Sequence, residues 1–268
     1  MALIDHHDAV LFDLDGVLYA GQHAVPAAPA AVAQLRSRGV GCAFVTNNAS
    51  RSAEQIAAHL QELSVPAQPQ EVFGSAPAAV AMLLQDVPPP ARVLVTGSDS
   101  LRRLVEEAGY SLADSAHGHP DAVIQGFDPG VGWTDLAEAS YAINQGAVWI
   151  ATNLDRSVPR ERGLAPANGA LVEAVGFATG IRPKAAGKPE PVMFLQAAEA
   201  LGARRPLVVG DRLDTDVLGG NRAGFTTALV LTGATTAAEA AASTAEQRPD
   251  VVLETLQDLF TDQHRELP

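Results

Sequence analysis

Short apolar runs alternate along this chain with longer segments in which apolar residues recur at helical spacing. The apolar runs predict buried strands near residues 9–12, 41–45, 92–96, 121–125, 147–151, 206–209, 227–231 and 251–253. The segments between them predict helices near 26–38, 52–63, 77–85, 98–108, 134–145, 168–179, 191–201 and 237–242, with one more at the end. Strands joined through helices by short connections form parallel sheets with right-handed crossovers. The pattern therefore predicts an α/β fold with a Rossmann-like parallel-sheet core.

Two changes along the chain indicate an inserted second domain. A run of three prolines ends near Pro90, and a new α/β passage with its own strands begins there. The character changes again at Lys184. We therefore expect a core made of residues 1–78 and 184–268, with a smaller α/β domain over 79–183. The segment 152–167 is polar and rich in Pro and Gly, and a loop of that length is often functional.

Charge and composition exclude several classes of partner. The chain has 31 acidic and 18 basic residues and a net charge of −13, which weighs against nucleic acids and anionic membranes. No apolar run approaches the roughly 18 residues needed to span a bilayer, and the first residues do not resemble a signal peptide. Cys42 is the single cysteine, so no disulfide can form within the chain. We expect a soluble cytoplasmic protein.

Two carboxylates, Asp13 and Asp15, follow the first apolar run and precede a glycine. Side chains alternate along a strand, so these two should point the same way. A strand buried on both faces cannot hold unpaired charge in its middle. The pair therefore belongs at the carboxyl end of the strand, where open α/β sheets bind ligands. Taken alone, this stretch could also be a strand that ends in a polar turn.

Further polar clusters follow other predicted strands and should meet Asp13 at the same edge of the sheet. Asp211 follows the strand at 206–209, and Lys188 precedes the neighbouring helix. Asp13, Asp15 and Asp211 would then crowd together, and two like charges about 4 Å apart repel by about 4 kcal/mol at an effective dielectric of about 20. Such a cluster needs a cation, and an all-oxygen set of ligands favours Mg²⁺.

The remaining polar groups suit a phosphate. Lys188 offers a point charge and Thr46 a hydroxyl donor, while Asn47 and Asn48 lead toward a helix N-terminus, where anions bind. A metal, a lysine and donors around one carboxylate describe phosphoryl transfer to an aspartate. Asp13 would attack phosphorus. Asp15 would protonate the leaving group and then take a proton from the hydrolytic water.

Four ordered motifs resemble those of the haloacid dehalogenase superfamily of phosphatases, and the match spans almost the whole chain. They are the segments 13–17, 46–50, 187–191 and 210–216. The last three are similar to the p-nitrophenylphosphatase/phosphoglycolate phosphatase branch, in which a large α/β cap lies between the second and third motifs. The resemblance implies that Mg²⁺ is held by Asp13, the backbone carbonyl of Asp15 and Asp211, and that phosphate is held by Thr46, Asn47, Asn48 and Lys188.

The resemblance leaves several points open. Asp216 is either a partner of Lys188 or an acid near a helix N-terminus. Pyridoxal phosphate phosphatases of this branch carry a histidine in the cap loop where this chain has Val158, which disfavours that substrate. Three basic residues of the same loop could contact substrate or could be a solvated charge run: Arg156, Arg160 and Arg162.

We therefore predict a Mg²⁺-dependent phosphatase of small phosphomonoesters, of the phosphoglycolate, glycerol phosphate or sugar phosphate class, that works through an aspartyl-phosphate. The resemblance also allows a homodimer formed through the cap. A phosphomutase or phosphotransferase on the same scaffold is the alternative enzyme. A receiver-like signalling domain that accepts phosphate is disfavoured, since it needs neither a second acid at Asp15 nor a long insert.

Overall fold

The computed structural model describes residues 2–160, 162–262 and 265–266 of the chain. Contacts between residues divide it into two compact units. The first unit comprises Met1–Thr46, Ala53–Phe73 and Lys188–Pro268, and the second comprises Asn47–Ser52 and Gly74–Gly187. The short segment Asn47–Ser52 therefore belongs to the second unit although it follows a strand of the first.

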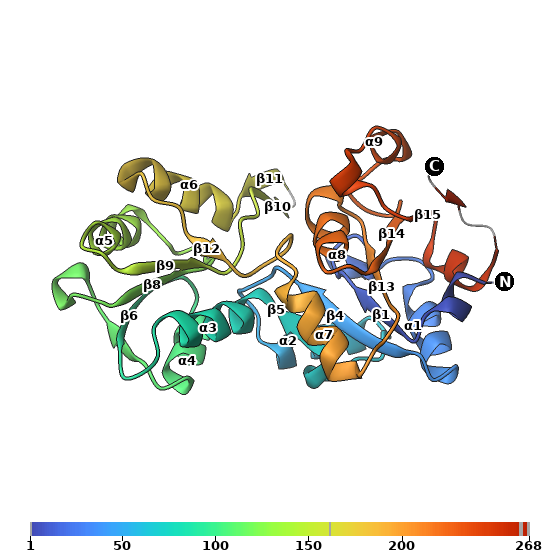
Figure 1. The fold of residues 1–268 in the computed structure, drawn as a ribbon, viewed down its shortest axis with the longest axis horizontal. Coiled ribbons are helices and arrows are strands. Elements are labelled where there is room, and N and C mark those ends of the chain that lie inside the picture. The colour runs from blue at the N-terminus through green and yellow to red at the C-terminus, as the bar shows by residue number, and fades with distance from the viewer. Residues whose placement is uncertain (1, 161, 263–264, 267–268) are drawn as a thin grey trace. The chain divides into compact units, whose positions relative to one another are not determined.

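The first unit is built on a seven-stranded sheet in the order β16-β15-β14-β13-β1-β4-β5 (Figure 1). Its interior strand β1 is buried and pairs in parallel with β13 and β4. The strands are β1 (Ala9–Phe12), β4 (Gly41–Thr46), β5 (Val72–Gly74), β13 (Pro206–Gly210), β14 (Thr226–Val230), β15 (Val251–Leu253) and an antiparallel edge strand β16 (Arg265–Glu266). The helices are α1 (Ala28–Ser37), α2 (Ala53–Glu62), α7 (Val192–Leu201), α8 (Leu218–Arg222) and α9 (Ala237–Ala241).

Shorter elements complete the first unit. A small antiparallel ribbon of β2 (Tyr19–Ala20) and β3 (His23–Ala24) follows β1. One turn of π-helix, η4 (Leu213–Val217), leads directly into α8. The 3₁₀ turns are η1 (Leu3–His6), η2 (Pro69–Glu71), η5 (Ala245–Gln247) and η6 (Leu256–Phe260).

The second unit has its own five-stranded sheet in the order β12-β9-β8-β6-β7, and all its strands are parallel. They are β6 (Arg92–Thr96), β7 (Ser111–Ala113), β8 (Ala122–Gln125), β9 (Val148–Ala151) and β12 (Lys184–Ala185). The helices are α3 (Ser75–Asp86), α4 (Asp99–Glu107), α5 (Trp133–Asn144) and α6 (Asn168–Thr179), with the 3₁₀ turn η3 (Ala116–Gly118). An antiparallel hairpin of β10 (Ser157–Arg160) and β11 (Gly163–Pro166) stands apart from the sheet.

The sequence pattern determines where these elements begin and which face they bury. In α4, the side chain of Ser98 accepts a hydrogen bond of 3.3 Å from the backbone N–H of Leu101 and caps the helix. Leu101 and Val105 lie one turn apart and are both buried, while the helix presents its charged residues to solvent. Strands β1 and β4 contain continuous apolar runs because both faces of their sheet are covered.

The α/β class and the parallel sheets agree with the sequence analysis, but details differ. The predicted loop 152–167 contains the hairpin β10–β11. The domain boundaries expected after residues 78 and 183 lie instead after Phe73 and Gly187. The first boundary lies earlier because α3 begins at Ser75 and packs against the sheet of the second unit. The second boundary lies later because β12 pairs with β9 of that sheet. Among the residues that the structure describes, no helix is both long enough and apolar enough to cross a bilayer.

Candidate active site

Asp13 directly follows β1, at the carboxyl end of that strand. Its backbone N–H still donates to Val209 of β13 (2.9 Å), and the residue is 9% exposed. The chain then turns, because the N–H of Leu18 donates to the carbonyl of Leu14 (2.8 Å). Asp15 lies within this turn and is exposed. Strand β1 ends at Phe12, and Asp13 is buried whereas Asp15 is exposed. That the two carboxylates point the same way stays a prediction.

Lys188 connects the acidic residues of this edge. Its ammonium nitrogen lies 2.5 Å from Oδ1 of Asp13 and 2.6 Å from Oδ1 of Asp216, and it also donates to the carbonyl of Val45 (3.3 Å). The residue is 4% exposed. Asp216 therefore is a partner of Lys188, one of the two alternatives that the sequence left open. Asp214 pairs with Arg212 on the surface (2.9 Å).

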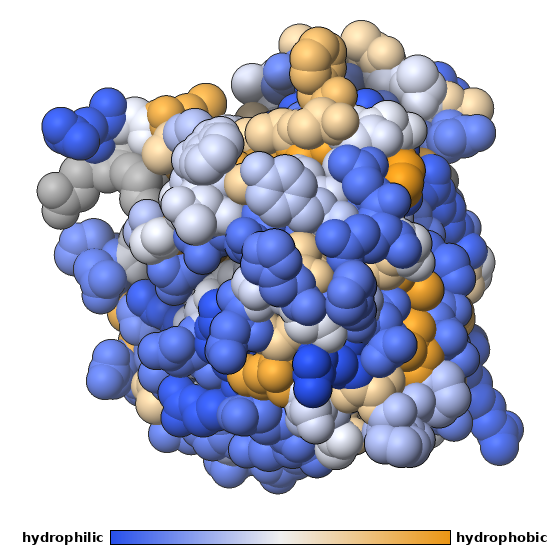
Figure 2. Space-filling model, turned by 90° about the vertical axis from the view of Figure 1, so that its left-hand side faces the viewer, coloured by the Kyte–Doolittle hydropathy of each residue, from blue (hydrophilic) through white to orange (hydrophobic). Residues whose placement is uncertain are grey.

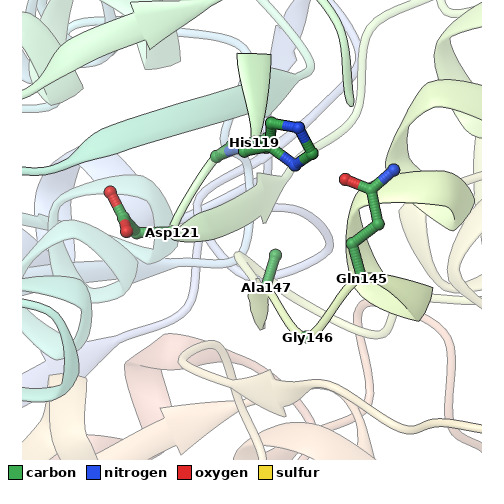
Figure 3. Close-up of a pocket in the computed structure, with 6 residues that line it drawn as sticks. His119, Asp121, Gln145, Gly146 and Ala147 are labelled. Carbon is green, nitrogen blue, oxygen red and sulfur yellow. The ribbon is translucent and has the colours of Figure 1, made fainter. Parts of the chain in front are cut away.

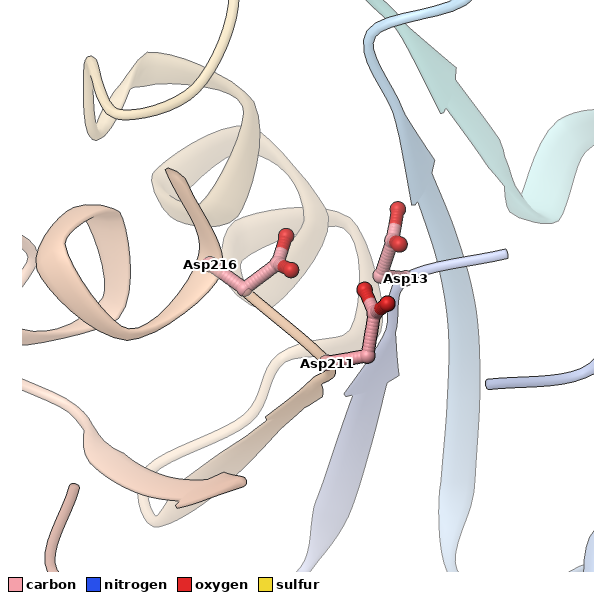
Figure 4. Close-up of side chains that lie close together, drawn as sticks. All are labelled: Asp13, Asp211 and Asp216. Carbon is pink, nitrogen blue, oxygen red and sulfur yellow. The ribbon is translucent and has the colours of Figure 1, made fainter. Parts of the chain in front are cut away.

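Three buried carboxylates gather at this edge of the sheet (Figure 4). Asp13, Asp211 and Asp216 each offer an oxygen atom, and these atoms lie within 4.8 Å of one another. In Asp216 the second oxygen accepts from the backbone N–H of Arg212 (3.1 Å). In Asp211, Oδ2 accepts from Ala234 (2.7 Å), whereas the buried Oδ1 has no hydrogen-bond partner among the residues described.

The electrostatics of this cluster follow from burial and proximity. Burial raises the pKa of Asp13 well above its ordinary value, and the neighbouring Asp216 adds to the effect. Burial and Asp216 likewise raise the pKa of Asp211 to about 6. Burial alone would lower the pKa of Lys188, but the carboxylates of Asp13 and Asp216 outweigh it and raise that pKa above its ordinary value. The lysine is therefore charged.

This set of residues fits a divalent cation. Three carboxylates and one ammonium leave a formal charge of −2 in a buried place, which is costly unless a cation offsets it. Lys188 contacts Oδ1 of Asp13, and Oδ1 of Asp211 is buried without a hydrogen-bond partner among the residues described. Hard carboxylate oxygens are the ligands that Mg²⁺ prefers.

Gly16 allows Asp211 to reach this place. The glycine has φ +82°, a conformation that other residues rarely adopt. A Cβ atom added there would lie 2.8 Å from Cγ of Asp211. Gly16 therefore has two roles at the site. It adopts the backbone conformation of the turn, and it leaves space for the carboxylate of Asp211.

The predicted phosphate-binding residues fall in both units. Thr46 is the last residue of β4, is 3% exposed and follows the carbonyl of Val45 that Lys188 contacts. Asn47 is buried and Asn48 half-buried, and both belong to the second unit. The side chain of Asn48 accepts from the N–H and the hydroxyl of Ser50 (2.9 and 2.8 Å), which begins the turn before α2.

The hairpin of the second unit carries the three arginines. Arg156 and Arg162 are exposed, and of Arg160 only the backbone is described. Val158 lies on β10 opposite Ala165. Among the residues described, no hydrogen bond assigns a role to the side chain of Arg156 or of Arg162.

A separate hollow of about 270 Å³ lies at the amino ends of β8 and β9 (Figure 3). His119, Asp121 and Gln145 line it. One oxygen of Asp121, the residue before β8, accepts a hydrogen bond from the backbone N–H of Arg92, the first residue of β6 (2.8 Å). In the part of the chain that the structure describes, the group of residues able to hold a metal is the acidic cluster at Asp13, not this hollow.

Sequence reasoning missed polar residues that contact Asn47 within the second unit. They are Ser75, Asn153 and Asp155. Asn153 and Asp155 directly follow β9, so the signal that located Asp13 and Asp211 could also have located them.

Comparison with known proteins agrees with this site. The model of the haloacid dehalogenase-like hydrolases matches residues 10–111, and a related model described as HAD-hydrolase-like matches residues 185–259. The D-glycerol 3-phosphate phosphatase of Mycobacterium tuberculosis is 42% identical over 97% of this chain and 73% of its own length. The acid sugar phosphatase of Staphylococcus aureus is 38% identical over 86% of this chain and 88% of its own.

Solved structures give the same result. A glycerol phosphate phosphatase from M. tuberculosis in complex with magnesium superposes with a TM-score of 0.93 at 42% identity, over 98% of this chain and 79% of that one. A 4-nitrophenylphosphatase from Thermotoga maritima gives a TM-score of 0.88 at 29% identity, over 97% and 98% of the two chains. The chain described here is a haloacid dehalogenase-like hydrolase.

Proposed function

We propose that this chain is a Mg²⁺-dependent phosphatase that hydrolyses small phosphomonoesters through phosphorylation of Asp13. The observation that supports the proposal most is the buried cluster of Asp13, Asp211 and Asp216 beside Lys188. It combines an available carboxylate, a fixed positive charge and a net negative charge that suits a divalent cation. Those are the components that phosphoryl transfer to an aspartate requires.

The residues have distinct roles in this proposal. A carboxylate oxygen of Asp13 attacks phosphorus, and the bond between phosphorus and the ester oxygen breaks as the new bond forms. Asp15, which is exposed, gives its proton to the leaving alkoxide. It then accepts a proton from the water that attacks the aspartyl-phosphate, so inorganic phosphate and free Asp13 result.

The surrounding groups bind and orient the phosphate. Lys188 and Thr46 supply a charge and a hydroxyl, and Asn47 and Asn48 supply amide groups. Asp13, Asp211 and the backbone carbonyl of Asp15 would hold Mg²⁺, which would supply positive charge next to the phosphoryl oxygens.

We propose a small phosphorylated metabolite as the substrate, and glycerol phosphate as the first candidate. The support is the relative at 42% identity over nearly the whole chain, a D-glycerol 3-phosphate phosphatase. The acid sugar phosphatase at 38% keeps sugar phosphates as the next class to test. Phosphoglycolate remains the third, on the sequence resemblance alone.

We further propose that the second unit is the cap of this enzyme and that two copies pair through it. Large aromatic side chains of that unit are exposed, Trp133 by 78% and Phe177 by 95%, and aromatic residues are enriched at protein interfaces. Figure 2, in which the left-hand side of Figure 1 faces the viewer, shows hydrophobic residues among the hydrophilic ones. Sedimentation of the purified protein tests the pairing.

The lone buried Cys42 supports a reducing, cytoplasmic compartment.

Release of inorganic phosphate from a panel of phosphomonoesters tests the function. We expect steady turnover with Mg²⁺, loss of turnover with EDTA, and the highest kcat/KM on a three-carbon or sugar phosphate. Turnover that needs a bisphosphate activator and transfers phosphate to a second hydroxyl would indicate the phosphomutase instead. Turnover that EDTA leaves unchanged would remove the metal from the proposal.

A further inference from the structure

Asn47, expected to bind phosphate, is held by side chains of the second unit. Its backbone carbonyl accepts hydrogen bonds from Asn153 Nδ2 (2.7 Å) and from the hydroxyl of Ser75 (2.8 Å). Its own side-chain Nδ2 donates to Oδ1 of Asp155 (3.0 Å). These three residues, Ser75, Asn153 and Asp155, are called the Asn47 anchor below. Both the backbone and the side chain of Asn47 are thereby fixed.

The geometry of the peptide bond extends this effect to the next residue. The peptide between Asn47 and Asn48 is trans, so its N–H points opposite to its carbonyl. Ser75 and Asn153 fix the direction of that carbonyl. They therefore also direct the N–H of Asn48, which the proposed function uses as a phosphate donor.

The anchor is itself held rigidly, because the side-chain amide and the backbone carbonyl of Asn153 are engaged. Its Oδ1 accepts from the backbone N–H of Asp155 (3.2 Å), and its carbonyl accepts from Nδ2 of the fully buried Asn168 (2.8 Å). With Oδ1 occupied, Nδ2 is directed toward Asn47. Ser75 is also fully buried and opens helix α3. Buried hydrogen-bonded networks of this kind fix one arrangement.

Gly187 packs closely against Asn47. A Cβ atom added to Gly187 would lie 2.6 Å from Oδ1 of Asn47 and 2.8 Å from Cβ of Asn153. The glycine therefore lets the chain pass directly beside the anchor. The hydroxyl of Ser98 adds a longer hydrogen bond to the carbonyl of Ala49 (3.4 Å).

We infer that Ser75, Asn153 and Asp155 are positioning residues that set the affinity of the site for phosphate by orienting Asn47 and the N–H of Asn48. The inference rests on the proposed function, in which these two residues bind phosphate. It adds that the second unit, and not only the strand that ends at Thr46, determines how tightly the phosphoryl group is held.

The test measures kcat, KM and competitive inhibition by inorganic phosphate in the full-length enzyme with 4-nitrophenyl phosphate and Mg²⁺. Asp155→Ala and Ser75→Ala each remove the acceptor or donor that contacts Asn47, and should raise both KM and the inhibition constant by about tenfold, which corresponds to about 1.4 kcal/mol, the size of one hydrogen bond. The value of kcat should change less. Ser75→Thr keeps the hydroxyl and should restore both constants. Asp128→Ala, which removes an acid of the same unit that accepts from Gly130 (2.7 Å), is the matched control.

Each outcome decides the inference. Unchanged inhibition constants in Asp155→Ala and Ser75→Ala would overturn it, as would a loss confined to kcat, which indicates a smaller active fraction and a merely structural role. If Ser75→Ala does not fold, Asp155→Ala decides, since Asp155 is only half-buried. Asn47→Ala separates the two proposals. If that variant binds phosphate normally, the phosphate role of Asn47 fails with the inference. If it binds weakly while the anchor variants bind normally, only the inference fails.

Discussion

The ammonium group of Lys188 lies 2.6 Å from Oδ1 of Asp216, and the two side chains are only 3% and 1% exposed. The other oxygen of Asp216 accepts from the backbone N–H of Arg212. Asp216 is thus engaged at both oxygens, whereas Asp211 keeps one buried oxygen without a partner among the residues described. Of these two acids, Asp216 is placed to hold the lysine and Asp211 to bind a cation.

Removal of the lysine charge should destabilise the metal-free protein. In Lys188→Met the carboxylates of Asp13, Asp211 and Asp216 remain buried without a compensating charge, and the free energy of unfolding should fall by about 3–5 kcal/mol. Urea unfolding with EDTA measures it. Lys184→Met is the control, because Lys184 is 62% exposed and its ion pair with Asp86 should contribute less than about 1 kcal/mol. Equal losses in the two variants would contradict the buried-charge argument.

Asp13→Asn should abolish turnover without unfolding the protein. The amide has the same shape and still offers Lys188 an oxygen, but it is not a nucleophile, and activity should fall below about 1% of wild type. Asp15→Asn should reduce kcat by about 10²–10⁴-fold, the usual effect of losing a general acid. Phosphate release measures both effects.

An acid at the opposite end of the same strand provides the control for Asp13→Asn. Asp8 accepts from the backbone N–H groups of Arg204 and Arg205. Asp8→Asn should keep full turnover. If Asp13→Asn were to retain activity close to that of Asp8→Asn, Asp13 could not be the nucleophile.

Much of the fold could be predicted because buried parallel strands have a clear sequence pattern. Strand β6 has the predicted bounds, and β1 and β4 end within one residue of the polar positions that follow their apolar runs. The hairpin of β10 and β11 could not be predicted in this way. Its strand β11 is largely exposed and shows no apolar run or alternation. Strand β7 is three residues long, too short for a pattern to emerge.

The site was predictable where topology alone brings residues together. Asp13 and Asp211 end neighbouring strands β1 and β13, and Lys188 precedes the helix between them. The exposure of Asp15 was not predictable, because this residue lies in a turn, next to Gly16 with φ +82°, and not in the strand. The contact of Asn153 with Asn47 joins positions 106 residues apart within the second unit, which no local pattern encodes.

The metal-free protein should lose stability as the pH rises through the titration of Asp211. The pKa of this acid is about 6 in the folded state, against an ordinary value of 3.8. Between these values the folded state binds more protons than the unfolded state, so the free energy of unfolding falls as pH rises, by a total on the order of 3 kcal/mol. Above pH 6 the cost is fully present.

Mg²⁺ should reverse this loss, since it binds the deprotonated acid. Urea unfolding between pH 4 and pH 8, with Mg²⁺ or with EDTA, measures both effects. Asp211→Asn should reduce the slope with EDTA and remove most of the stabilisation by Mg²⁺. Stabilisation by Mg²⁺ that is as large at pH 5 as at pH 7.5 would contradict the assignment of Asp211 to the metal.

Gly16→Ala should weaken Mg²⁺ binding, and Gly21→Ala provides a matched control. Both glycines have positive φ, +82° and +62°, so each alanine costs a similar backbone strain of about 1–2 kcal/mol. The methyl group at position 16 would press on the carboxylate of Asp211, whereas nothing lies within 4 Å of the one at position 21. Backbone strain should therefore destabilise the two variants by similar amounts. The contact with Asp211 should destabilise Gly16→Ala further.

A Mg²⁺ titration of turnover separates the two effects. In Gly16→Ala the half-saturating Mg²⁺ concentration should rise by about tenfold or more, because displacing one carboxylate removes a charged ligand, with an effect of at least about 1.4 kcal/mol. In Gly21→Ala it should stay at the wild-type value. Equal midpoints in the two variants would show that the space beside Gly16 does not control the position of Asp211, and that the glycine serves only the turn.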